Sequence, residues 1–346
     1  PNHKPDQVIC EEIKDYFKEK VDKIYTDIGE SPKSTDMDML MDFNEQRWTQ
    51  FEPIDESQLL SVIAEVNKKE CEADPLPLKV LLQCLDEVKT ILLFIVNDSL
   101  TSGVFPTAVK QALVRPAIKD ENGDVNNYQN YRPISNLPFL SKILEKCVHK
   151  QLTSHLDKHS LHAEKQSGYR ENHSCETATL SIYDDLLCVS DSKSKLILIL
   201  LDLSAAFDTV NHELLLKKLE QKFGISGIVL HWFTSYLQNR SFTVTINKAK
   251  SQRCFLRIGV PQGSILGPIL FILYTKDLET IARSHGFSIH LYADDTQLYI
   301  EFNPLYEDID SIELKVIECL EHIKAWMTIN KLKLNPGKTE VMSVQA

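Results

Sequence analysis

The chain contains 346 residues, of which 43% are hydrophobic, and it carries a formal net charge of −11 at pH 7. This length and hydrophobic fraction support two or three compact subdomains with substantial cores. The longest useful apolar stretch, residues 265–274, is interrupted by Gly267 and Pro268 and is too short to cross a membrane. No signal peptide is visible, and because the first residue is Pro rather than Met, we expect the chain to be a segment of a longer protein.

The negative charge is concentrated toward the N-terminus. Residues 1–103 carry 11 Lys+Arg and 22 Asp+Glu, whereas residues 104–346 carry 27 of each sign. The overall sign argues against a nucleic-acid partner. Residues 104–170, however, contain 10 basic and 6 acidic residues, so a local, salt-sensitive nucleic-acid surface is compatible with the composition.

The eight cysteines lie far apart and include no C-x-x-C pair. This spacing argues against a zinc module and favours free thiols in a reducing compartment. We therefore expect an intracellular protein whose cysteines serve core packing.

The predicted elements alternate between helices and short strands. Residues 1–50 contain two helix-like pieces and a linker at 31–36. The other helices are expected at 55–68, 81–95, 138–154, 176–189, after the N-cap Asn211, and at 227–237, 265–284 and 309–327. The strands are expected at 112–118, 196–201, 242–246 paired with 255–260, and in a hairpin at 288–302.

The connections complete this pattern. A polar loop covers 119–130, and turns are expected at 131–133 and 261–264, with a last hairpin turning at 335–337. The whole predicts a helix-rich α+β protein with a small antiparallel sheet at its centre.

The tetrad Tyr292-Ala293-Asp294-Asp295 lies between two apolar strand-like runs. Two adjacent carboxylates repel each other and are costly to desolvate, so they usually persist where a cation shares the site. Asp202, at the end of the apolar run 196–201, is a candidate third carboxylate. Three acidic groups on two neighbouring strands can hold a pair of Mg2+ ions for in-line phosphoryl transfer. The alternative is a hairpin tip in which the two Asp are only turn residues.

Three motifs appear in an order and at a spacing that resemble the palm of a reverse transcriptase. They are Asp202-Leu203-Ser204-Ala205-Ala206-Phe207-Asp208, Gly259-Val260-Pro261-Gln262-Gly263-Ser264 and Tyr292-Ala293-Asp294-Asp295. Two further motifs resemble more narrowly the polymerases of LINE-type, non-LTR retrotransposons of the jockey and chicken-repeat groups. They are Asn130-Tyr131-Arg132-Pro133-Ile134-Ser135 and Leu332-Lys333-Leu334-Asn335-Pro336-Gly337-Lys338-Thr339. The resemblance covers roughly residues 55–346.

The resemblance implies an α+β right-hand polymerase fold, with fingers and a palm built on a small antiparallel sheet. It implies a charged or linker region at 1–54, a fingers-type region at 55–190 and a palm at 191–346, the reverse transcriptase domain overall spanning about 104–346. We expect the thumb to be largely absent, since the chain ends soon after the Lys338 motif. Nothing in the chain resembles the endonuclease domain of full-length family members.

The resemblance also implies catalytic roles. Asp202 and Asp294 would bridge two Mg2+ ions, for which Mn2+ can substitute, with Asp295 close by and the backbone carbonyl of Leu203 as a further ligand. One ion would lower the pKa of the primer 3′-hydroxyl, and the other would hold the triphosphate and the leaving pyrophosphate. Lys338 matches the family lysine that protonates the pyrophosphate, with a solvated hairpin lysine as the alternative.

Substrate contacts follow in the same way. Phe207 matches the ring beneath the incoming sugar that excludes a 2′-hydroxyl; a core phenylalanine is the alternative. Gln262 would hydrogen-bond near the sugar and template, and Gly263 would let the backbone approach the nucleotide, unless both form a plain strand-to-helix turn. Arg132 and Lys119 match finger residues that hold the triphosphate, although a loop lysine is often only solvated.

The segment Gln166-Ser167-Gly168-Tyr169-Arg170 resembles the family stretch that faces the template, which makes Arg170 a candidate nucleic-acid contact. The implied function is RNA-directed DNA synthesis for element replication, from dNTPs on an RNA template with a DNA primer at a nicked target. The implied location is a cytoplasmic ribonucleoprotein and the nucleus.

Two alternatives differ in kind from this function. One is an inactive, element-derived relic that binds only RNA or a protein; the intact carboxylates, PQG turn and Phe207 argue against it. The other is an RNA-synthesising relative, against which Phe207 also argues because an RNA polymerase should carry a smaller group there.

Overall fold

The computed structural model describes residues 4–29, 46–191 and 194–345, so the predicted linker at 31–36 lies outside the described residues. The chain divides into two compact units, each assembled from separate stretches of sequence. The first comprises Pro1–Ile24, Asp42–Leu161 and Asn211–Gly267, and the second comprises Tyr25–Met41, His162–Val210 and Pro268–Ala346. The predicted functional regions 1–54, 55–190 and 191–346 stay predictions.

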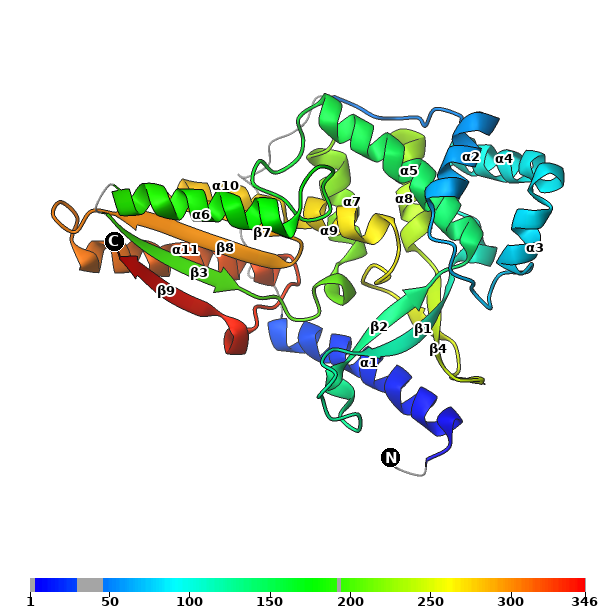
Figure 1. The fold of residues 1–346 in the computed structure, drawn as a ribbon, viewed down its shortest axis with the longest axis horizontal. Helices are drawn as coiled ribbons and strands as arrows, with labels where there is room; N and C mark the ends of the chain where they lie inside the picture. The colour runs from blue at the N-terminus through cyan, green and yellow to red at the C-terminus, as the bar shows by residue number, and fades with distance from the viewer. Residues whose placement is uncertain (1–3, 30–45, 192–193, 346) are drawn as a thin grey trace. The chain divides into compact units, whose positions relative to one another are not determined.

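The sheet of the first unit has the strand order β2-β1-β4-β5, with β6 also paired to β4 (Figure 1). Its strands are β1 Gln111–Ile118, β2 Tyr131–Asn136, β4 Arg240–Ile246, β5 Ala249–Lys250 and β6 Cys254–Leu256. The β1–β4 pair is parallel and the other pairs are antiparallel. This mixed sheet was not predicted: β1 and β4 meet across a long connection that allows parallel pairing. The small antiparallel sheet that was predicted lies in the second unit.

The described residues of the first unit also form seven α-helices. They are α1 Asp6–Ile28 as far as Ile24, α2 Glu56–Glu65, α3 Leu78–Gln83, α4 Leu85–Ser102, α5 Phe139–Lys158, α7 His212–Gln221 and α8 Gly227–Leu237. The predicted N-cap is confirmed, since the Asn211 side chain accepts the Leu214 N–H at the start of α7. The single helix predicted at 81–95 is wrong: the backbone breaks at Cys84, between α3 and α4.

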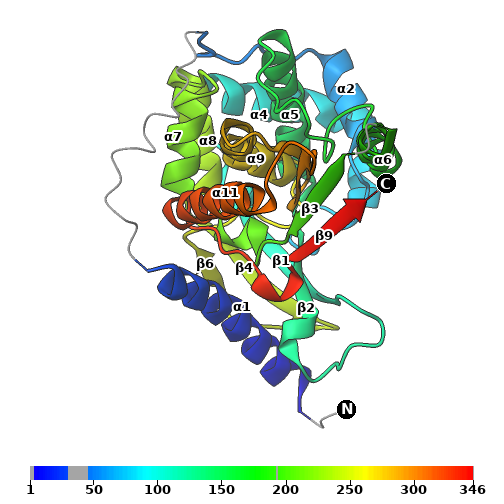
Figure 2. The same ribbon diagram turned by 90° about the vertical axis from the view of Figure 1, so that its left-hand side faces the viewer.

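Helix α1 packs along the sheet through one apolar face (Figures 1 and 2). Cys10, Ile13 and Phe17 recur at helical spacing and join the core cluster that contains Val114 of β1 and Val244 of β4. This burial explains why α1 forms despite the strongly charged sequence around these positions.

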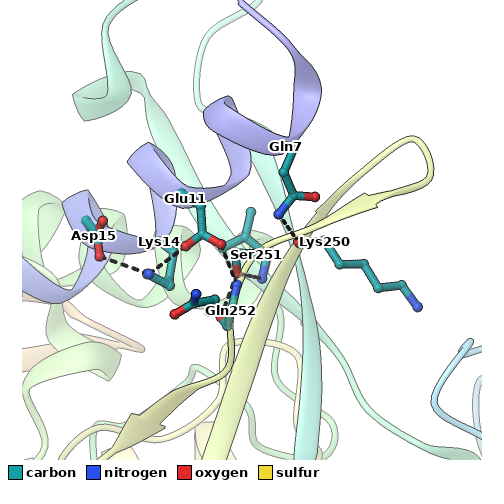
Figure 3. Close-up of polar contacts among 8 residues, drawn as sticks. Gln7, Glu11, Lys14, Asp15, Lys250, Ser251 and Gln252 are labelled. Atoms are coloured by element: carbon teal, nitrogen blue, oxygen red, sulfur yellow. Dashed lines mark hydrogen bonds and ion pairs between the residues drawn. The ribbon is translucent and has the colours of Figure 1, made fainter.

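Polar contacts fix α1 against the β4–β5 hairpin and the residues after it (Figure 3). The Gln7 side chain donates to the carbonyl of Lys250 at 2.6 Å, and the Glu11 carboxylate accepts the backbone N–H of Gln252 at 2.7 Å. Lys14 pairs with the same carboxylate at 2.6 Å. At least one of the many N-terminal acidic residues, Glu11, therefore makes contacts within the first unit.

The turn predicted at 131–133 is wrong, because these residues begin strand β2. Pro133 pairs with Pro116 of β1. Because β2 lies at the edge of the sheet, no strand on its other side needs a backbone N–H from Pro133. The predicted pairing of 242–246 with 255–260 is confirmed by the register Ser241 with Phe255, although β6 ends at Leu256.

The second unit contains an antiparallel sheet in the order β7-β8-β3-β9. Its strands are β3 Lys195–Leu201, β7 Ser288–Tyr292, β8 Asp295–Phe302 and β9 Glu340–Gln345. Figures 1 and 2 show α6, Cys175–Asp191, over one face of this sheet and α11, Ile309–Ile329, over the other.

Strand β3 is apolar on both faces, as its continuous apolar sequence predicts. Leu196 and Leu198 pack with Tyr299 of β8 and Leu186 of α6. Ile199, which points to the opposite face, is fully buried. The strand that precedes Asp202 is thus held firmly from both sides.

Two other predictions in the second unit are wrong. The helix predicted at 265–284 consists of α9 Leu266–Thr275 and α10 Asp277–Ser284. The last hairpin is absent from the described residues, because β9 pairs with β3, for example Val341 with Ile199, rather than with residues 332–334. The edge of β3 offers six paired positions to β9, whereas residues 336–338 form only a short 3-10 turn.

Among the helices of the described ranges, none is both long and apolar enough to cross a membrane. The eight cysteines are free thiols, as predicted. The prediction that they serve core packing is confirmed for four buried ones, Cys10, Cys71, Cys147 and Cys319, but it is wrong for Cys84, Cys175 and Cys188, which are exposed.

Candidate active site

The two adjacent carboxylates lie at the connection between β7 and β8, as predicted. Tyr292 pairs with Asp295, so Ala293 and Asp294 form a two-residue turn. Ala293 has φ +59°, a left-handed conformation that residues with a Cβ rarely adopt. Such a strained residue persists only where its surroundings hold it.

Asp202 lies beside this turn because β3 pairs with β8. Leu201 is opposite Thr296, so the next residue along β3 comes level with the start of β8. Desolvation, followed by the negative charges of Asp294 and Asp202, raises the pKa of the Asp295 carboxyl, while Lys338 acts in the opposite direction. The structure therefore brings the three predicted carboxylates and Lys338 into one electrostatic site.

Residues 332–338 hold the end of β3. Asn335 donates its backbone N–H to the Asp202 carbonyl and its side-chain amide to Asp202 Oδ2, both at 2.9 Å. The Lys338 Nζ lies 3.6 Å from the same Oδ2. Leu203, the predicted backbone ligand, is buried and forms an isolated antiparallel bridge with Leu334. Asn335 belongs to one of the family motifs, but its contact with Asp202 was not predicted, because nothing in the motif indicates which residue Asn335 contacts.

Phe207 is half-buried and lies between two aromatic rings. It stacks on Phe271 with ring centroids 4.9 Å apart and an interplanar angle of 27°. Tyr169 meets it edge-on at 6.3 Å. Desolvation, followed by the negative charge of Asp294, raises the pKa of Tyr169, so the neighbour of Phe207 is also near the carboxylate turn.

The carboxylates fit a divalent cation by donor chemistry. Within the described residues, no group of three or more His, Cys, Asp and Glu side chains is already arranged to hold a metal ion. Magnesium in polymerases usually takes one or two carboxylates and fills its remaining positions with waters and substrate phosphates, so a complete protein cage is not required. Asp202, Asp294 and Asp295 offer only the hard oxygen donors that Mg2+ prefers, and a cation would relieve the repulsion at Asp295.

The predicted turn at 261–264 belongs to the first unit and is fixed by Ser135 of β2. The Ser135 N–H donates to the Gln262 carbonyl at 2.7 Å. Gly263 has φ +112°, and a Cβ there would lie 2.5 Å from the Ser135 carbonyl oxygen. Only glycine fits this position, because the backbone of Ser135 approaches it closely. The predicted approach of a nucleotide to Gly263 stays a prediction.

A buried acid from α5 holds the residues that follow this turn. The Glu145 carboxylate accepts the backbone N–H groups of Ile265 and Leu266 at 2.8 and 3.2 Å. Burial raises the pKa of Glu145, against the opposing effect of the Arg240 guanidinium. The sequence interpretation missed this residue, and only its position among the apolar residues of a helix signals it.

Lys119 and Arg132 lie on the β1–β2 hairpin of the first unit. The Lys119 N–H donates to the Asn130 carbonyl at 2.8 Å, and its Nζ donates to the Gln129 carbonyl at 2.6 Å. Arg132 is exposed and pairs with Ala117 of β1, whereas Lys119 follows the last residue of β1, Ile118. Their predicted triphosphate contact stays a prediction.

Arg170 belongs to the second unit and contacts its own segment. Its Nη1 donates to the carbonyls of Ala163 and Glu164 at 3.2 and 3.5 Å. Its predicted nucleic-acid contact is untested. The structure thus groups Asp202, Leu203, Phe207, Asp294, Asp295 and Lys338 in the second unit, together with Arg170, and Lys119, Arg132, Gln262 and Gly263 in the first.

A family model described as reverse transcriptase (RNA-dependent DNA polymerase) matches residues 118–346. The match covers more than half of the chain, which therefore belongs to the reverse transcriptase family. This confirms the family resemblance seen in the motifs.

The curated relatives are polymerases of mobile elements. The chain is 30% identical over 259 residues to a probable RNA-directed DNA polymerase from transposon BS of Drosophila melanogaster, a match that covers 72% of this chain and 27% of that protein. It is 28% identical over 258 residues to the RNA-directed DNA polymerase from mobile element jockey of Drosophila funebris, covering 73% of this chain and 27% of that protein. The chain thus spans about a quarter of the length of these relatives.

Proposed function

We propose that this chain is the reverse transcriptase portion of a LINE-type, non-LTR retrotransposon and transfers nucleotides from dNTPs to a primer 3′-hydroxyl on an RNA template. The observation that carries the proposal is the meeting of Asp202 with Asp294 and Asp295 at the ends of two paired strands, with Lys338 beside them. Family membership gives this carboxylate group its polymerase context.

In this proposal residues 55–190 form the fingers-type region and residues 191–346 form the palm of a right-hand polymerase fold. The antiparallel sheet β7-β8-β3-β9 and the two-residue Asp turn support the palm assignment. The β1–β2 hairpin, which carries Lys119 and Arg132, supports the fingers assignment. The reverse transcriptase domain would span about 104–346.

Two Mg2+ ions would be held by Asp202, Asp294 and Asp295, with the backbone carbonyl of Leu203. When bound, such ions supply charge neutralisation for the triphosphate and lower the pKa of the primer hydroxyl. Asn335 holds the Asp202 carboxylate in one orientation through its side-chain amide. Lys338, whose side chain is 69% exposed, is free to donate a proton to the leaving pyrophosphate.

The remaining predicted residues would position substrates. The half-buried Phe207 ring would exclude a 2′-hydroxyl by its bulk, because Phe271 supports it from one side. Lys119 and Arg132 would hold the triphosphate, while Gln262 and Gly263 would lie near the sugar and template.

The partners in this proposal are an RNA template, a DNA primer at a nicked target, and dNTPs. Arg170 would contact the template. The proposed location is a cytoplasmic ribonucleoprotein and the nucleus.

Primer extension tests the proposal. The chain is supplied with poly(rA), oligo(dT), dTTP and Mg2+, and compared with its Asp294→Asn, Asp295→Asn double variant. Extension by the unsubstituted chain alone is expected. Equal extension by the double variant would contradict the metal-site assignment, whereas RNA binding without extension by either protein would favour the relic.

A further inference from the structure

The outer edge of β7 is covered by residues 165–168, which form an isolated parallel bridge with it through Gln166 and Leu291. The Leu291 N–H donates to the Lys165 carbonyl, and the Ser167 N–H donates to the Leu291 carbonyl, both at 2.9 Å. A hydrogen bond of 3.0 Å also joins Ser167 Oγ to His290 Nε2. The strand that enters the carboxylate turn is therefore held by β8 on one side and by the 165–168 segment on the other.

This segment ends with a backbone contact to the carboxylate turn itself. A Cβ placed on Gly168 would lie 2.3 Å from the Ala293 nitrogen and 3.0 Å from both Ala293 Cα and the Tyr292 carbonyl carbon. These are backbone atoms, which cannot rotate away as a flexible side chain can. Gly168 is not among the glycines with positive φ. Close contact with the turn, not an unusual backbone conformation, is therefore what requires glycine here.

A buried side chain fixes Gly168 in this position. The Gln166 side chain is 2% exposed, and its Oε1 accepts the Gly168 N–H at 2.8 Å. Gln166 also forms the bridge to Leu291. Gly168 is thus held by its hydrogen bond to Gln166, and Gln166 is itself anchored to β7 by the bridge to Leu291.

The contact acts on the most strained residue of the turn. Ala293 has φ +59°, and the peptide that Gly168 touches is the one that precedes it. Because Asp294 and Asp295 follow directly, the orientation of this peptide decides where both carboxylates point. A backbone held in a sparsely populated conformation needs neighbours that over-determine it.

We propose that Gly168 is a positioning residue, which braces the Tyr292–Ala293 peptide and so sets the orientation of the Asp294 and Asp295 carboxylates. The inference rests on the proposed polymerase function. The family resemblance relates residues 166–170 only to the template, whereas this inference gives Gly168 a role in positioning the catalytic carboxylates. Gln166 is the second member of this brace, through its bond to the Gly168 N–H.

The test is the Gly168→Ala variant, with Gly286→Ala as its control. Gly286, unlike Gly168, has a positive φ, +77°, so alanine is strained there by the backbone alone, but an added Cβ meets no atom within 4 Å. We expect Gly168→Ala to lower kcat for primer extension at least about ten-fold with little change in KM for dTTP, since a 1 Å misplacement can cost about 100-fold. A loss of equal size in Gly286→Ala, or unchanged kcat in Gly168→Ala, would overturn the proposal.

Amide hydrogen exchange provides a readout that needs no activity. Faster exchange in peptides that cover 288–300 is expected for Gly168→Ala, with unchanged exchange in those that cover 240–256. If the wild-type chain extends no primer, the proposed function fails, but the exchange measurement still decides whether Gly168 braces the turn. Unchanged exchange at 288–300 would show that it does not.

Gln166→Met provides a second test if Gly168→Ala does not fold. This substitution removes the amide oxygen that accepts the Gly168 N–H and puts an apolar side chain of similar length in its place. The expected result is a several-fold fall in kcat with faster exchange at 288–300, whereas wild-type values of both would overturn the proposal.

Discussion

Asn335 holds Asp202 at two points, through its backbone N–H on the carbonyl and its side-chain amide on Oδ2. The backbone bond fixes the end of β3, and the side-chain bond fixes the carboxylate. A residue 133 positions away in sequence therefore orients the carboxylate that joins the Asp294–Asp295 turn.

Asn335→Ala should lower the rate of primer extension by about ten-fold or more, because it removes one hydrogen bond to a charged group, and such bonds contribute about 1.5–3 kcal/mol. Asn335→Asp should be more harmful, since it adds a fourth negative charge. Steady-state kcat measures both effects. Asn126→Ala is the matched control, because Asn126 is an exposed residue that contacts Asp124; an equal loss there would contradict the assignment.

Asp295→Asn should stabilise the metal-free chain at neutral pH. The pKa of Asp295 is raised in the folded state by desolvation and by Asp294 and Asp202. Above the unfolded value of about 4, the folded state binds more protons than the unfolded state, so stability falls as pH rises toward and through the folded pKa. Replacing the acid removes this loss.

We expect Asp295→Asn to raise Tm by on the order of 1–2 °C at pH 7 in EDTA, an amount limited by solvent screening. The gain should vanish below about pH 4, where the wild-type carboxyl is protonated in both states. Thermal unfolding at the two pH values measures this. A gain of the same size at both would point to a packing effect instead of a charge effect.

Phe207→Ala should increase incorporation of rNTPs relative to dNTPs, because the bulk that excludes a 2′-hydroxyl is removed. Phe207→Tyr is the control, since it keeps the ring that stacks on Phe271. The ratio of kcat/KM for UTP and dTTP is the measurement. Tyr169→Leu should give a smaller change in the same direction, because it removes the edge-on neighbour of Phe207; an unchanged ratio in Phe207→Ala would refute the sugar-exclusion role.

Gly263→Ala should destabilise the chain by about 1–3 kcal/mol, because alanine is strained at positive φ. The added Cβ would also lie 2.5 Å from the Ser135 carbonyl oxygen, which forces the turn away from β2. Urea denaturation measures the loss, with Gly286→Ala as a control for φ alone. Equal losses in the two variants would show that the contact with Ser135 contributes nothing.

Local sequence patterns correctly predicted those helices and strands that depend mainly on neighbouring residues in the sequence. The apolar run before Asp202 and the alternation around the Asp turn gave β3 and the β7–β8 hairpin, and Asn211 marked the start of α7. The family motifs identified the three carboxylates and Lys338, which the structure then places in one site.

Features that depend on distant partners escaped prediction. The β9–β3 pairing was read as a local hairpin, because nothing in residues 340–345 names β3 as their partner. The strand character of Pro133 depends on β2 being an edge. Gly168 is required only by contact with Ala293, and that proximity exists only once β7 and the 165–168 segment are paired.

The position of β9 also affects how the chain behaves in concentrated solution. β9 pairs with β3 and ends the strand order of its sheet, and Val341 and Met342 are 62% and 42% exposed. β2, the edge of the other sheet, carries Pro133, whereas the sequence of β9, EVMSVQ, contains neither proline nor lysine. Such an unprotected edge favours strand addition between molecules, so self-association of this segment should begin at β9 and should be suppressed by Val341→Lys.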